Sequence, residues 1–91
     1  MKVEVWLPRV LRPQVGGQSR VTIQGSNVGD ILRNLVDLHP LVGPHILDAE
    51  GNLQPYISVF RNETNIRDLE HLQTSLAEAD ELRILPAVAG G

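Results

Sequence analysis

The chain has 91 residues, of which 42% are hydrophobic and none is cysteine, and its net charge is −3. This length predicts one domain with a modest core, and the lack of cysteine excludes disulfides, thiolate catalysis and cysteine-ligated metals. With no apolar run long enough for a membrane span, no signal-peptide layout and no basic excess, we expect a cytoplasmic protein that binds neither membrane nor nucleic acid.

Two segments near the start, residues 2–7 and 19–24, alternate between apolar and polar side chains, as strands with one buried face do. The first places Val3 and Val5 inward and Trp6 outward, and the second places Val21 and Ile23 inward. We therefore expect a hairpin whose strands are joined by a long loop that closes on two glycines.

A helix follows the hairpin. Ser26 or Asn27 can cap its first turn, and Pro40 ends it. Its apolar residues recur at helical spacing, which predicts one amphipathic helix packed across one face of a sheet. The expected stripe consists of Val28, Ile31, Leu32, Leu35 and Leu38.

Two further strand patterns lie in the second half of the chain. Residues 56–62 alternate with Ile57 and Val59 inward and Phe60 outward, and a short strand is expected around Ile66. Residues 69–80 are predicted to form a loop with a possible helical turn.

The last strand, residues 81–85, buries Leu82 and Ile84 by the same alternation. The element order predicts an α+β fold of the ubiquitin-like β-grasp type, a mixed four- to five-stranded sheet with one main helix across one face. The final strand is then expected beside the first. We expect residues 1–86 to form this domain and residues 87–91 to form a flexible C-terminal tail.

The tail itself is apolar and slender, and it stops on a carboxylate that we expect to be free. Glycine lacks a side chain and reaches backbone angles closed to other residues, which suits a chain end that enters another protein's active site. The candidate residues are Pro86, Ala87, Val88, Ala89, Gly90 and Gly91.

Three stretches carry a family resemblance: LPRVLRPQVGGQ, VFRNETNIRDL and RILPAVAGG. They resemble the ubiquitin-like sulfur carrier family (MoaD/ThiS-like), and within it the CysO-type carriers of cysteine biosynthesis. The resemblance implies a carrier protein that is not an enzyme and binds no cofactor. It also implies that a partner uses ATP to adenylate Gly91, which is then converted to a thiocarboxylate that donates sulfur.

The resemblance also implies partners. These are an E1-like adenylating enzyme of the MoeB/ThiF type, a sulfur donor protein, a cysteine synthase that accepts the sulfur, and a JAMM-type zinc metalloprotease. Two alternatives remain open. In the first, the chain is the small subunit of molybdopterin synthase and acts with that enzyme's large subunit. In the second, it is a ubiquitin-like modifier that is joined to lysines.

Three outward side chains are candidates for partner binding. By the alternation of their strands, Trp6, Phe60 and Leu85 are all expected to face away from the helix, on strands that are neighbours in this fold. They are then expected to form an exposed apolar patch beside the tail, unless loops cover part of it.

One departure from the family pattern concerns the residue before the aspartate that leads into the last strand. Family members often have glycine there, whereas this chain has Ala79, which predicts a different turn.

No metal site is expected. The spacing of His39, His45 and His71 matches no recognised ligand motif. The adjacent carboxylates of Asp80 and Glu81 point to opposite faces of a strand and form no catalytic pair.

Overall fold

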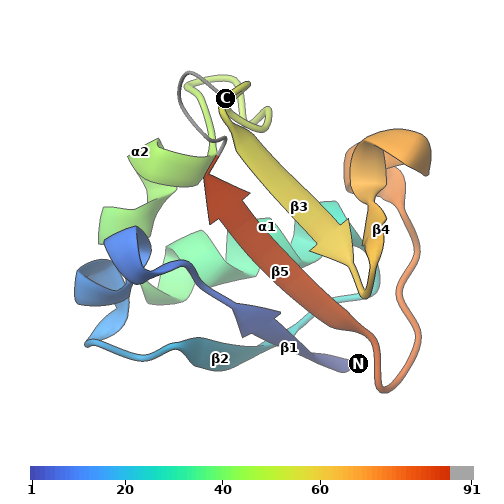
Figure 1. Ribbon diagram of the computed structural model, residues 1–91, viewed down its shortest axis with the longest axis horizontal. Helices are drawn as coiled ribbons and strands as arrows, with labels where there is room; N and C mark the ends of the chain where they lie inside the picture. Colours follow the sequence, from blue (N-terminus) through green and yellow to red (C-terminus); the bar gives the residue numbers. More distant parts are fainter. Residues whose placement is uncertain (87–91) are drawn as a thin grey trace.

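The structure is a computed structural model that describes residues 1–86, and it contains one mixed sheet with helices packed against one side (Figure 1). Its strands cross the sheet in the order β2-β1-β5-β3-β4. The central strand β5 is parallel to β1 and antiparallel to β3. This confirms the expected α+β β-grasp class and the place of the last strand beside the first. The strands are β1 (Lys2–Trp6), β2 (Arg20–Gln24), β3 (Ile57–Arg61), β4 (Thr64–Asn65) and β5 (Glu81–Pro86).

One helix, α1 (Val28–Leu38), crosses the sheet, and the other helical segments are short. Among the helices of residues 1–86, none has the length and apolar character that a membrane crossing requires. The short segments are the helix α2 (Gly43–Ile46) and the 3₁₀ helices η1 (Arg9–Val15), η2 (Pro40–Val42), η3 (Ile66–Asp68) and η4 (His71–Gln73).

The helix α1 begins after the predicted cap and packs its apolar side on the sheet, but one residue of the predicted buried stripe is wrong. The cap is Asn27, whose side-chain oxygen accepts a hydrogen bond from the Asp30 amide at 2.8 Å. The inclusion of Leu38 in the buried stripe is wrong, because 65% of this residue is exposed. At about 100° per residue, Leu38 projects about 80° away from Val28 and lies at the margin of the stripe.

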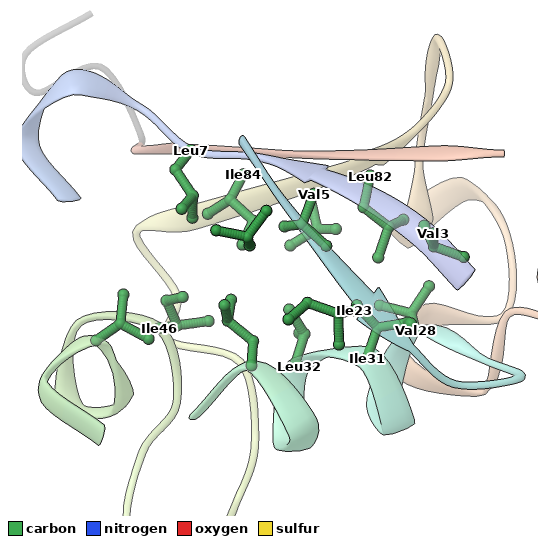
Figure 2. Close-up of a cluster of buried hydrophobic side chains, with 14 of the residues drawn as sticks. Val3, Val5, Leu7, Ile23, Val28, Ile31, Leu32, Ile46, Leu82 and Ile84 are labelled. Carbon is green, nitrogen blue, oxygen red and sulfur yellow. The ribbon is translucent and has the colours of Figure 1, made fainter. Parts of the chain in front are cut away.

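The core lies between the sheet and α1. Figure 2 shows side chains of β1 and β5 pointing toward those of α1, and Val5, Leu82 and Ile84 are fully buried. The strands β1, β2, β3 and β5 bury alternate residues, as the sequence pattern predicted. Within residues 1–86, no helix covers the opposite face of the sheet (Figure 1).

Two connections differ from the expectation. The long loop of the hairpin contains η1, which buries Leu11 and Val15 even though Pro13 lies inside it. The short strand predicted around Ile66 ends at Asn65 instead, and Ile66 begins η3. The Asn65 side chain accepts a hydrogen bond from the Arg67 amide at 2.9 Å, which turns the chain out of the strand.

In the turn before β5, the backbone of Ala79 adopts the left-handed conformation. The prediction that alanine at this position imposes a different turn is therefore wrong. Ala79 has φ 72°, the conformation that glycine adopts most easily. The next residue holds the turn in place. The Asp80 carboxylate accepts hydrogen bonds from the Ala77 amide at 2.8 Å and from the Asn62 side chain at 3.0 Å, and these lower the pKa of Asp80.

Replacing Ala79 with glycine is therefore expected to stabilise the domain by about 1 kcal/mol, because it removes the clash of the alanine Cβ in this conformation. In a domain of this size, the midpoint of thermal unfolding should rise by about 4–8 °C. The control is Ala77→Gly in the same turn. Ala77 is exposed and is not among the residues with positive φ, so its change should lower stability slightly. Equal shifts of the same sign in the two variants would contradict the strain at Ala79.

Candidate functional site

The tail root lies at one end of the central strand. Pro86, which we call the tail root, is the last residue of β5 and pairs with Ile57 at the start of β3, whereas the pairing of β5 with β1 ends at Arg83. Because β1 and β5 are parallel, the end of β1 lies at this same edge. The predicted tail residues Ala87, Val88, Ala89, Gly90 and Gly91 lie outside the described residues.

The three residues predicted to bind partners all lie on the face without α1. Trp6 and Phe60 are partly buried, and Leu85 is 44% exposed. In the sheet, Arg83 of β5 pairs with Trp6 on one side and with Phe60 on the other. The two aromatic side chains are therefore neighbours across one arginine and do not form a purely apolar patch.

Trp6 is covered by arginines on both neighbouring strands. The Arg20 guanidinium of β2 lies 5.1 Å from the centre of the indole ring, and that of Arg83 lies 5.8 Å from it. Guanidinium groups at these distances are attracted to the negative face of the ring. Loops were expected as the cover of Trp6, but Arg20 and Arg83 cover it instead. The alternation of β2 and β5 places both arginines on this outer face.

Two hollows lie on either side of the ridge that Arg83 and Leu85 form on β5. The larger, of about 680 Å³, is lined also by Phe60 and Thr64 and by the acidic residues Glu63 and Glu81. The smaller, of about 230 Å³, is lined also by Trp6, Pro8 and Arg12. The Nε of Arg12 donates a hydrogen bond to the Leu7 carbonyl oxygen at 3.2 Å, which holds that side chain beside the tail root. The surface around the tail root is thus a ridge, formed by Arg83 and Leu85, that separates two hollows.

Groups suited to catalysis or metal binding are not gathered in this region. Residues 1–86 contain no cluster of three histidine, aspartate or glutamate side chains placed to hold a metal ion. Glu81 faces the sheet surface while Asp80 is engaged in the preceding turn, so the two carboxylates do not act together.

The sequence matches the ThiS family over residues 5–91. The sulfur carrier protein CysO of Mycobacterium tuberculosis is 33% identical over 93 residues, which cover the whole of both chains. Small archaeal modifier protein 3 of Haloferax volcanii is 33% identical over 95 residues, again over the whole of both chains. In structure, the chain resembles a crystal structure of the Amycolatopsis orientalis BexX/CysO complex with a TM-score of 0.89 and 32% identity, covering 98% of this chain and 99% of the other.

Proposed function

Since this chain belongs to the ThiS family of ubiquitin-like sulfur carriers, which are carriers and not enzymes, we propose that it carries sulfur on Gly91 for cysteine biosynthesis. The observation that supports this most is the similarity to CysO, which extends over the full length of both chains and includes the segment that ends in two glycines. The fold supports it as well, because the central strand β5 runs as far as Pro86, directly before the last five residues of the sequence.

The proposed chemistry begins with activation, because a carboxylate is a poor electrophile. A partner enzyme joins the Gly91 carboxylate to AMP from ATP and releases pyrophosphate. Hydrosulfide from the sulfur donor then attacks the acyl carbon, the new C–S bond forms, and AMP leaves with the electrons of the C–O bond. The product is a thiocarboxylate, which is more acidic than an ordinary thiol and is therefore a reactive anion at neutral pH.

The domain's part in this chemistry is to present the tail. Five residues beyond Pro86 span at most about 17 Å in an extended chain, enough to reach into an active site while the domain stays outside. Proline restricts φ and so limits the direction in which the tail begins. Trp6, Phe60 and Leu85 are proposed to contact the partner during this reach, because they lie on the exposed face of the sheet beside the tail root.

Four partners follow from this proposal. An E1-like adenylating enzyme uses the ATP, a sulfur donor protein supplies the sulfur, and a cysteine synthase accepts it. If the amino group of the new cysteine then takes over the acyl group of Gly91, a JAMM-type zinc metalloprotease is needed to release the amino acid by hydrolysis. ATP thus serves the partner, and no cofactor is proposed to bind this chain.

A second function is favoured by one comparison. Similarity to a small archaeal modifier protein also extends over the whole chain. In that case the activated Gly91 would react with lysine amines of other proteins and form isopeptide bonds. Both functions require the same activated carboxylate, so the product identifies the function.

Mass spectrometry of the intact protein tests the proposal. After incubation with its adenylating enzyme, ATP and sulfide, the chain is expected to gain about 16 Da, because sulfur replaces one oxygen of the carboxylate. Addition of the cysteine synthase with its amino-acid substrate should remove this gain and yield a cysteinyl adduct. No gain of mass with an enzyme that adenylates the chain would contradict the carrier function, and isopeptide conjugates without a thiocarboxylate would favour the modifier.

A further inference from the structure

On the face of the sheet that α1 does not cover, here called the helix-free face, acidic and basic side chains lie in different rows across the strands. Glu4 of β1 lies opposite Glu81 of β5 in one row of the sheet. In the next row toward Pro86, Arg20, Trp6 and Arg83 lie side by side on three neighbouring strands. The positive row therefore lies nearer the tail root, and the negative row lies farther from it.

Each arginine is weakly held in its present position. The Arg20–Glu4 and Arg83–Glu81 ion pairs are 3.8 Å and 3.7 Å long, and the two arginine side chains are 56% and 57% exposed. Exposed pairs of this kind contribute little to stability. The planar guanidinium group makes its strongest interactions with two carboxylate oxygens at once, so an incoming carboxylate competes well for it.

The tryptophan between the two arginines has an unused hydrogen-bond donor. Its Nε1 atom is buried and has no acceptor among the described residues. A buried indole N–H usually has a partner, so this group is unusual. The arginines cover the ring, and a movement of their guanidinium groups toward a partner would make more of the indole accessible.

We propose that Arg20 and Arg83 recognise carboxylate side chains on the adenylating enzyme, and that the indole of Trp6 joins the interface when the two guanidinium groups turn toward those carboxylates. This rests on the proposed function, which supplies the enzyme as the partner. The smaller hollow, which Trp6, Pro8 and Leu85 line, receives an apolar side chain that flanks the carboxylates. The occupant of the face is therefore an acidic protein surface with apolar neighbours.

Charge complementarity favours a protein over a nucleic acid as that occupant. A phosphodiester backbone carries negative charge at every step, and the row that contains Glu4 and Glu81 would repel it. A protein surface can place carboxylates opposite the arginines and other groups opposite the glutamates. The chain's net charge of −3 points in the same direction.

Direct binding tests the inference without requiring sulfur transfer. The affinity of the full chain for the adenylating enzyme is measured by calorimetry in the absence of ATP, for the wild type, Arg83→Glu and Arg83→Lys. We expect Arg83→Glu to weaken binding about tenfold or more, and Arg83→Lys to weaken it less, because lysine keeps the charge but not the planar group. Raising NaCl from about 0.05 to about 0.5 M should weaken the wild type markedly and Arg83→Glu little.

The matched control is Arg33→Glu. It makes the same charge change at an exposed arginine of α1, on the other side of the sheet, and should leave affinity within about twofold of the wild type. Equal losses in Arg83→Glu and Arg33→Glu would overturn the inference, as would binding of duplex DNA with the same dependence on Arg83. Circular dichroism of each variant establishes that it is folded.

Different results would contradict the carrier function and the recognition by Arg20 and Arg83. If the enzyme binds in an Arg83-dependent manner but the wild type gains no sulfur, the inference holds and the carrier function is wrong. If the wild type gains sulfur and Arg83→Glu binds the enzyme as tightly as the wild type does, the function holds and the inference is wrong.

Discussion

Deletion of Gly91 is expected to abolish sulfur loading while leaving the domain folded. The shortened chain still ends in a carboxylate, but that group lies about 3.3–3.6 Å short of its former reach. Misplacement of a reacting group by as little as 1 Å can lower a rate by about 100-fold, so adenylation should fall by at least that factor. The buried core residues of the described part all precede Leu85, so the midpoint of thermal unfolding should not change. Intact mass after reaction with the adenylating enzyme, ATP and sulfide measures the loss.

Two further variants separate the position of the carboxylate from the character of the tail. One extra alanine after Gly91 moves the carboxylate by the same distance in the opposite direction and should also prevent loading. Ala89→Gly keeps the length, adds no bulk and should be loaded as well as the wild type. A chain without Gly91 that gains about 16 Da at nearly the wild-type rate would contradict the assignment of sulfur to this residue.

Most of the fold could be predicted because the burial of one face of a strand or helix produces a regular spacing of apolar residues in the sequence. Alternation identified the buried residues of β1, β2, β3 and β5, and the spacing of apolar residues identified α1. The pattern failed where the chain is irregular. Pro8 and two glycines indicated a loop between the first two strands. Leu11 and Val15 of η1 were missed because a 3₁₀ segment has no long apolar repeat.

The candidate site could be predicted only in part, for a different physical reason. Alternation alone placed Trp6, Phe60 and Leu85 on the outer face of the sheet. The position of Arg83 between the two aromatic residues depends on the register of β1 and β3 with β5, which are distant in sequence. Register of this kind is fixed by packing of the whole sheet, so a single sequence does not reveal it.

Ile84→Ala is expected to be the most destabilising change among these predictions. Ile84 is completely buried in the central strand and pairs with Val59 of β3. Removal of its side chain leaves a cavity beneath the sheet and should lower the free energy of unfolding by about 2–5 kcal/mol. The total stability of a domain this size is about 5–14 kcal/mol, so a large part of it would be lost. The midpoint of thermal unfolding should fall by about 10 °C or more, as measured by circular dichroism.

The neighbouring residue gives the matched control. Leu85 is on the opposite face and is 44% exposed, so Leu85→Ala should change the free energy of unfolding by about 0.5 kcal/mol or less. The same substitution is expected to weaken binding of the adenylating enzyme, because Leu85 forms the ridge between the two hollows. Ile84→Ala should thus affect stability and Leu85→Ala should affect recognition, although the two residues are adjacent. If both variants lost stability equally, the helix-free face would be part of the core and would not be available to a partner.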